Sequence, residues 1–308
     1  MKKFLTSLVV FGLIGCFIYS YITRENTENN DNNLTPITEE EKDELEDLGY
    51  SKEDITLIRE NLNEEEIDEI KNTPNENLTE YVDIPYFKLE NLERYIEYDN
   101  RTDYSKENTV MYVNIGLDRG FYTNIKTVSN PHDTLVLVNK YNSLPSGIEP
   151  NDLIKTESVY MQREAGEALL KMADAMRNDG ISIILQSGYR SESTQTYLYN
   201  NYVSYDGVEN ADTYSARPNH SEHQTGLAID LSHDGTLEEY FEDTIQFDWL
   251  SKNAYKYGFI MRYPKDKVFI TGYTYEPWHY RYVGTKVASI IYNEGITFEE
   301  YYVKYIEN

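Results

Sequence analysis

One ten-residue segment, SEHQTGLAID from Ser221 to Asp230, constrains the fold of this chain more than any other stretch of its sequence. His223 and Asp230 lie seven residues apart on either side of Gly226, a residue that permits a tight turn. Three apolar residues lead into Asp230, so its carboxylate is expected to face the interior, where it needs a cation. Two such side chains on adjoining segments can converge on one ion.

A second segment, EPWHYRYVG from Glu276 to Gly284, carries another histidine, His279. Pro277 cannot donate a backbone hydrogen bond, which makes a helix interior unfavourable here. Glu276 and His279 therefore do not form a helical metal-binding motif, and we expect them on a loop or a short strand.

The choice of metal ligands is restricted, because the only cysteine, Cys16, lies in an apolar run near the N-terminus. No disulfide can form within the chain, and any metal must be held by His, Asp and Glu. His223, Asp230 and His279 are the kind of N and O ligands that catalytic zinc sites use in threes, with a fourth position left for water. The inventory therefore predicts Zn²⁺ as the cofactor.

Two further residues could complete a hydrolytic site. Zinc activates its bound water, but a free carboxylate must still take the proton, and Glu276 is the spare carboxylate. Arg190, which follows a predicted strand at 181–185, is the candidate for stabilising the developing oxyanion. His220 precedes His223 by three residues but matches no motif, so we expect a structural role for it.

Three motifs, SGYRS…Q, SxHxxGxAxD and ExWH, occur in this order between about Leu135 and Val303. Together they resemble the D-alanyl-D-alanine carboxypeptidases of the vancomycin-resistance type, within the wider group of lysostaphin-like, D-Ala-D-Ala-cleaving and hedgehog-like zinc folds. Asn219 stands where that family usually has Gly. Because Asn tolerates a left-handed backbone well, we expect the turn to persist.

The resemblance implies a role for each residue of the predicted site. It places zinc on His223, Asp230 and His279, and makes Glu276 the base and Arg190 the oxyanion clamp. Gln195 and Ser221 match positions that help hold the terminal carboxylate or backbone of the substrate.

The function implied by this resemblance is a zinc-dependent D,D-carboxypeptidase that removes the terminal D-Ala from peptidoglycan stem peptides. An L,D-carboxypeptidase or a peptidoglycan endopeptidase would use the same metal and base with a different pocket. A non-catalytic, zinc-stabilised module that binds the cell wall is the alternative of another class. The presence of both Glu276 and Arg190 favours an enzyme. The sequence does not indicate an oligomeric state.

The charge balance bears on possible partners. The 308 residues include 54 acidic and 28 basic ones, for a formal net charge of −26. Phosphate binding needs a concentrated basic surface, so this balance argues against a nucleic-acid partner. Hydrophobic residues make up 40% of the chain, which is enough for a folded core.

The N-terminal residues predict export and attachment to a membrane. Lys2 and Lys3 precede an apolar stretch from Phe4 to Ile22, which is long enough to cross a bilayer as a helix. Residues 1–23 are therefore predicted to be a signal anchor, with a lipoprotein signal ending at Cys16 as the alternative. Either one places the rest of the chain on the extracytoplasmic face of the membrane.

The remaining sequence predicts an α+β fold, in which an antiparallel sheet flanked by helices carries the zinc site behind a small helical spacer. Helices are expected at 89–96 and 165–176, and strands at 110–113, 134–138 and 181–185. The predicted parts are a linker at 24–34, an acidic spacer of three capped helices at 35–80, a mixed pre-domain at 81–134 and a zinc carboxypeptidase domain at 135–308.

Overall fold

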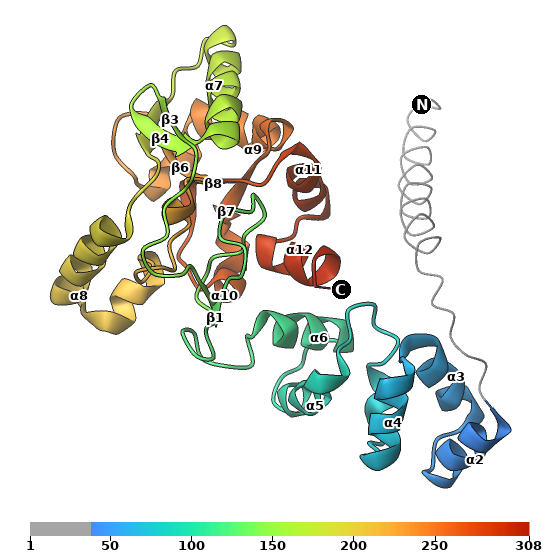
Figure 1. Cartoon of the computed structure of the whole chain (residues 1–308). Coiled ribbons are helices and arrows are strands. Elements are labelled where there is room, and N and C mark those ends of the chain that lie inside the picture. Colours follow the sequence, from blue (N-terminus) through green and yellow to red (C-terminus); the bar gives the residue numbers. More distant parts are fainter. Residues whose placement is uncertain (1–37, 308) are drawn as a thin grey trace, which may run out of the picture. The chain divides into compact units, whose positions relative to one another are not determined.

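The computed structural model describes residues 38–307, which fall into two compact units divided between Asp83 and Ile84. Figure 1 shows the elements of both units. The first unit contains short helices, and the second contains the sheet and its helices.

The first unit consists of three capped helices, as predicted. At each N-terminus a Thr, Ser or Asn side chain accepts a hydrogen bond from a backbone N–H, and an acidic side chain three residues later accepts one from the backbone of the cap. Apolar side chains such as Leu45, Ile58 and Ile67 are buried between the helices. The elements are α2 (Glu39–Asp47), α3 (Lys52–Asn61), α4 (Glu64–Asn72) and η1 (Leu78–Glu80).

The predicted location at a membrane is overturned. Between residues 38 and 307, no helix combines the length and the hydrophobicity needed to cross a bilayer. The segment α8 (Glu192–Tyr214) is interrupted at Gly207, where the backbone is not helical, and its sequence is rich in Ser, Thr, Asn, Asp and Glu. The predicted anchor or lipoprotein signal at 1–23 and the linker at 24–34 lie outside the described residues.

The second unit begins with helices, and two predicted strands there are wrong. Residues 110–113 lie inside α6 (Lys106–Ile115), which the Ser105 side chain caps and Gly116 ends in a left-handed conformation. Residues 134–138 contain no strand. Instead, the carbonyls of Thr134 and Val136 accept hydrogen bonds from the Arg281 side chain at 3.0 and 2.9 Å. The predicted helix at 89–96 is present as η2 (Leu89–Asn91) and α5 (Leu92–Asp99).

A four-stranded antiparallel sheet forms the centre of this unit, which confirms the predicted α+β class. Its spatial order is β5 (Ile184–Ser187), β6 (Ala228–Ser232), β8 (Glu276–Tyr282) and β7 (Phe259–Tyr263). The predicted strand at 181–185 starts later than expected, at Ile184. Two small pairs accompany the sheet, β1 (Lys126–Thr127) with β2 (Asn142–Ser143) and β3 (Leu153–Thr156) with β4 (Val159–Gln162).

Helices cover the sheet and bury its apolar side chains. The predicted helix at 165–176 is α7 (Arg163–Asn178), which contributes Leu169, Met172 and Met176 to the main core. A second cluster joins the two C-terminal helices, α11 (Thr285–Glu294) and α12 (Phe298–Tyr305), to Ile260 of β7 and to Leu137. The other helices are η3 (Glu222–Thr225), η4 (Glu239–Asp243), α9 (Ile245–Asn253), η5 (Ala254–Tyr257), η6 (Lys265–Lys267) and α10 (Val268–Thr271).

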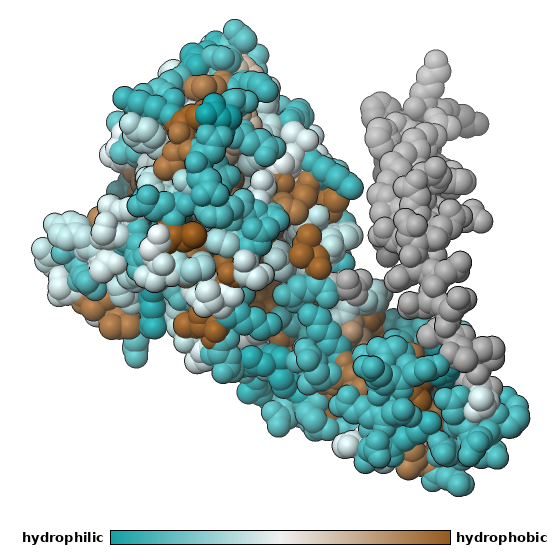
Figure 2. Space-filling model, in the orientation of Figure 1, coloured by the Kyte–Doolittle hydropathy of each residue, from teal (hydrophilic) through white to brown (hydrophobic). Residues whose placement is uncertain are grey.

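The surface is mainly polar, as the acidic composition suggests. Figure 2 shows one face, on which hydrophilic residues predominate and hydrophobic ones appear in small groups between them. The apolar side chains that the sheet and helices bury are thus largely shielded from solvent on this face.

Candidate metal centre

Strand register brings two of the predicted ligands together. Asp230 in β6 lies directly opposite His279 in the neighbouring strand β8, so their side chains project from the same face of the sheet. Both residues are buried. The expectation that His279 lies on a strand or loop is confirmed.

The third predicted ligand reaches the same point through a turn. His223 lies in η3, and Gly226 then reverses the chain in a left-handed conformation, with φ of 70°. A side chain at Gly226 would also crowd the backbone nitrogen of Gln162, 3.1 Å from an added Cβ atom. The turn therefore needs glycine for both its backbone angle and its close packing.

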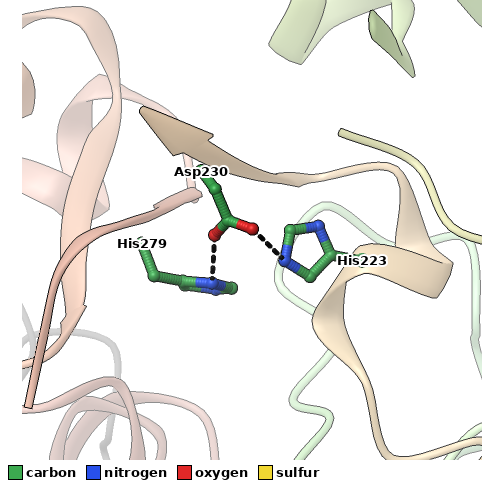
Figure 3. A group of neighbouring side chains, drawn as sticks. All are labelled: His223, Asp230 and His279. Carbon is green, nitrogen blue, oxygen red and sulfur yellow. Dashed lines mark hydrogen bonds and ion pairs between the residues drawn. The ribbon is translucent and has the colours of Figure 1, made fainter. Parts of the chain in front are cut away.

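The three side chains form one compact group (Figure 3). The Asp230 carboxylate lies between the two imidazoles, with Oδ1 at 3.0 Å from Nδ1 of His279 and Oδ2 at 3.2 Å from Nε2 of His223. One potential ligand atom from each of the three lies within 4.8 Å of the others, and all three residues are buried.

The outward nitrogens of both rings face oxygen atoms. Nδ1 of His223 lies 2.8 Å from the carbonyl oxygen of Gly188, and Nε2 of His279 lies 3.5 Å from a carboxylate oxygen of Glu222. In a neutral imidazole, one nitrogen carries the proton and the other a lone pair. If the outward nitrogens carry the protons, both lone pairs face Asp230, and the donor set fits a divalent cation.

The electrostatics of the group favour a positive charge at its centre. Burial opposes ionisation of Asp230, but the two histidines outweigh it and hold its pKa well below the usual value. Burial also opposes a charge on His279, yet its hydrogen bonds to Asp230 and Glu222 raise its pKa to about 9.

Glu276 supplies a carboxylate beside the group. It is the first residue of β8, and its Oε2 lies 3.7 Å from Nδ1 of His279. Among residues 38–307, no hydrogen bond engages this carboxylate. Burial raises the pKa of Glu276 to about 8, although the nearby His279 and Arg190 act in the opposite direction.

Arg190 lies near Asp230 and is held in place by two hydrogen bonds. Its Nη1 donates to Oε1 of Gln195 at 2.9 Å, and its Nη2 donates to Oγ of Ser187 at 3.0 Å. The same Nη2 is 3.9 Å from Oδ2 of Asp230. These contacts fix the plane of the guanidinium group close to the metal-binding group.

The metal-binding group lies in a groove of about 320 Å³, and the remaining predicted residues, Gln195 and Ser221, also line it. Gln195 is 1% exposed, accepts from Arg190 and donates to the carbonyl of Ala216 at 2.6 Å. Its amide is thus engaged with the protein, whereas no side-chain hydrogen bond of Ser221 is found in the described part of the chain. The groove contains all seven predicted residues, together with aromatic side chains that include Tyr202, Tyr214, Tyr273 and Trp278.

The structure also tests the expectations for Asn219 and His220. Asn219, which replaces the usual glycine, adopts a left-handed conformation with φ of 68°, so the turn persists as expected. His220 is not a member of the metal-binding group; its Nδ1 lies 2.7 Å from the carbonyl oxygen of Asn139.

One buried carboxylate was not singled out from the sequence. Glu222 is 2% exposed and contacts His279, Arg262 and Arg281. A signal for it exists, because Glu222 stands in the motif that carries His223, and a carboxylate beside a buried ligand needs partners of its own. Those partners lie 40 to 59 residues further along the chain, so no local pattern identifies them.

The fold and the site together define a class of protein. Two imidazoles and a carboxylate converge in a groove that also contains a spare carboxylate and an arginine. This set of groups is typical of metal-dependent hydrolases.

Comparison with known proteins identifies the family. Residues 158–285 match the family model VanY, D-alanyl-D-alanine carboxypeptidase. The putative carboxypeptidase YodJ of Bacillus subtilis is 40% identical over 225 residues, which cover 67% of this chain and 82% of YodJ. A D-alanyl-D-alanine carboxypeptidase of Enterococcus faecalis is 39% identical over 179 residues, which cover 54% of this chain and 65% of the relative.

A solved structure agrees with these matches. The LD-carboxypeptidase LdcB superimposes with a TM-score of 0.57 at 43% identity, over 59% of this chain and 91% of LdcB. The chain belongs to the VanY family of D-alanyl-D-alanine carboxypeptidases. It is thus an enzyme of the zinc metallopeptidase class, and its activity is that of a peptidoglycan carboxypeptidase.

Proposed function

We propose that this protein is a zinc-dependent D,D-carboxypeptidase that removes the terminal D-Ala from peptidoglycan stem peptides. The observation that carries the proposal is the position of Glu276, a carboxylate without a hydrogen bond among the described residues, beside the buried group of His223, Asp230 and His279. Within the family, this arrangement accounts for both the metal and the base that hydrolysis of a peptide bond requires.

The metal would be held by His223, Asp230 and His279, through the ring nitrogens that face Asp230. When bound there, zinc lowers the pKa of a water molecule and polarises the scissile carbonyl. Nitrogen and oxygen donors in a buried, three-residue group are the ligands that catalytic zinc sites use.

Glu276 moves the proton in this scheme. Its carboxylate takes a proton from the attacking water as the new C–O bond forms, and then returns that proton to the nitrogen of the departing D-alanine, so that the peptide C–N bond breaks.

Arg190 stabilises the negative charge that develops on the carbonyl oxygen. A donor held rigidly by two neighbours does not have to reorganise as charge develops. Gln195 acts by holding Arg190, whereas Ser221 remains available to contact the substrate backbone or its terminal carboxylate.

An L,D-carboxypeptidase is the second candidate, because the similar structure LdcB is described as an LD-carboxypeptidase. The two activities need the same metal and base and differ in the stem peptide that the groove admits. An endopeptidase would also need room beyond the new carboxyl terminus.

Mass spectrometry of defined muropeptides tests the proposal. We expect incubation with a pentapeptide to release one D-Ala and to leave the tetrapeptide. Cleavage of tetrapeptides alone would establish the second candidate, and cleavage of cross-linked dimers alone would establish an endopeptidase.

Glu276→Gln tests the proposed base in the same assay. The amide cannot accept the proton, so we expect turnover to fall by about 10²- to 10⁴-fold. Zinc should remain bound, because Glu276 lies outside the group of ligands. Full activity of this variant would refute the role of Glu276, and complete loss of zinc would show that it is a ligand.

A further inference from the structure

A buried network of charged side chains contacts the metal-binding group through Glu222. The side chain of Glu222 has no exposed surface. Its Oε1 accepts hydrogen bonds from Nε of Arg262 at 2.8 Å and from Nη1 of Arg281 at 3.0 Å. Its other oxygen, Oε2, faces Nε2 of the predicted metal ligand His279 at 3.5 Å.

The network extends to helix α12. Arg262 donates from Nη1 to Oε2 of Glu299 at 2.9 Å and from Nη2 to Oε1 of Glu299 at 2.6 Å. Arg262 thereby joins Glu299, on α12, to Glu222, which directly precedes His223. With Arg281, the network holds two arginines and two glutamates, so its formal charges cancel.

The contact to His279 bears on which ring nitrogen is available to a metal. A proton on Nε2, facing the Glu222 carboxylate, leaves the lone pair on Nδ1, which faces Asp230. Carboxylates that accept from the far nitrogen of a ligating histidine fix its tautomer and its ring orientation. A separation of 3.5 Å is long for a hydrogen bond. The negative charge of Glu222 therefore also helps to hold the proton on Nε2 of His279.

The two histidines differ in this respect. The far nitrogen of His223 faces a neutral backbone carbonyl, whereas that of His279 faces a carboxylate. The charge balance around that carboxylate depends on Arg262, and therefore on Glu299. A residue on a distant helix is thus connected by ion pairs to one side of the metal centre.

We propose that Glu222 is a positioning residue that fixes the ligating nitrogen of His279, and that Glu299 on α12 sustains metal affinity through Arg262. This inference rests on the proposed zinc site. The side chain of Glu222 has no exposed surface and acts through His279, and Glu299 acts through Arg262 on Glu222.

Zinc affinity, measured by competition with a chromogenic chelator, tests the role of Glu222 directly. Glu222→Gln keeps the size of the side chain but removes its charge, and we expect zinc affinity to fall about 10- to 100-fold. Glu222→Asp keeps the charge and should recover part of the loss. Nitrogen-15 NMR of labelled histidine in the zinc-loaded protein should find the His279 proton on Nε2 in the wild type.

Glu299→Gln tests the connection to α12. This change leaves two buried arginines with one ionised carboxylate, and the excess positive charge near His279 should weaken zinc binding. Glu300→Gln is the matched control, because Glu300 is a buried neighbour on the same helix that pairs with Lys267 instead. The double variant Arg262→Met/Glu299→Met removes a neutral pair and leaves Glu222 with Arg281, so zinc affinity should recover.

The outcomes separate this inference from the proposed function. A wild-type protein that binds no zinc refutes the proposed function. If the wild type binds zinc and both Glu222→Gln and Glu299→Gln bind it equally well, only the positioning role is refuted. An equal loss in Glu300→Gln would assign the effect to general weakening of α12 and would also refute it. If Glu222→Gln does not fold, the inference is tested by the other two variants. It is supported if Glu299→Gln weakens zinc binding and the double variant restores it, and refuted if Glu299→Gln binds zinc as well as the wild type.

Discussion

At the scale of single residues, the site depends on side chains whose polar atoms are held in place by neighbouring groups of the protein. Both oxygens of Asp230 face an imidazole nitrogen. Arg190 makes one hydrogen bond to Gln195 and another to Ser187. Such groups need little reorganisation when a substrate binds, which is the condition for strong electrostatic stabilisation of a transition state.

Arg190→Lys should separate the geometry of this residue from its charge. Lysine keeps the positive charge but lacks the planar guanidinium that contacts Gln195 and Ser187 together. We expect kcat/KM to fall by about 10²- to 10³-fold, with zinc affinity unchanged. Steady-state kinetics on the pentapeptide and chelator competition provide the two measurements.

Arg177→Lys is a suitable control, because Arg177, on α7, forms exposed ion pairs with Asp174 of the same helix and with Glu157. It should leave kcat/KM unchanged. Wild-type kinetics in Arg190→Lys would mean that the charge alone is sufficient, or that Arg190 takes no part in the reaction.

At the scale of elements, the site is built from a turn and two paired strands. The turn at Gly226 carries His223 to the group, and the register of β6 with β8 sets Asp230 against His279. The local part of this arrangement could be predicted from sequence, because a glycine between two ligands indicates a turn. The pairing of β6 with β8 was not predicted, since the strands lie far apart along the chain. Only the family resemblance implied that Asp230 and His279 bind the same ion.

The errors in the predicted elements also have physical causes. The capping boxes of the first unit are local patterns and were predicted correctly. Residues 110–113 form a short apolar run, and such a run does not distinguish a buried strand from a buried helix. At 134–138, the backbone is satisfied by the side chain of Arg281, at least 145 residues away, which no local pattern reveals.

Gly226→Ala should weaken the turn and the metal site together. Alanine is strained at φ of 70°, and its Cβ would lie 3.1 Å from the backbone nitrogen of Gln162. We expect the free energy of unfolding to fall by more than about 1 kcal/mol, measured by urea denaturation, with weaker zinc binding.

Gly180→Ala is the matched control. Gly180 has a similar φ of 77°, but an added Cβ would meet nothing within 4 Å. It should therefore lose stability from backbone strain alone and keep its zinc affinity. Equal effects of the two substitutions on stability and on zinc affinity would show that the contact with Gln162 is unimportant.

At the scale of the whole molecule, the metal-binding group belongs to one unit only. All three members of the group lie after the division between Asp83 and Ile84, and no second group of this kind occurs among residues 38–307. A ligand that binds only the folded state stabilises it in proportion to the logarithm of its concentration. Zinc should therefore stabilise the second unit.

Removal of zinc should lower the unfolding temperature of the second unit. At free zinc of 100 times its dissociation constant, the stabilisation amounts to about 2.7 kcal/mol. Thermal unfolding followed by circular dichroism, with and without EDTA, measures the shift. Asp230→Asn should lose this response, because it removes a ligand charge from the centre of the group. A chelator effect that persists in this variant would place the ion elsewhere.

The strand order of the sheet has a consequence for how the protein assembles. In space, β6 pairs with β5 on one side, and β8 pairs with β7 on the other, so the boundary between β6 and β8 joins two antiparallel pairs. His223 and Asp230 come with the first pair, while Glu276 and His279 come with the second. Each pair carries only half of the reaction centre. Docking of the two halves would thus create the ion site and bring the proton acceptor to it at the same moment.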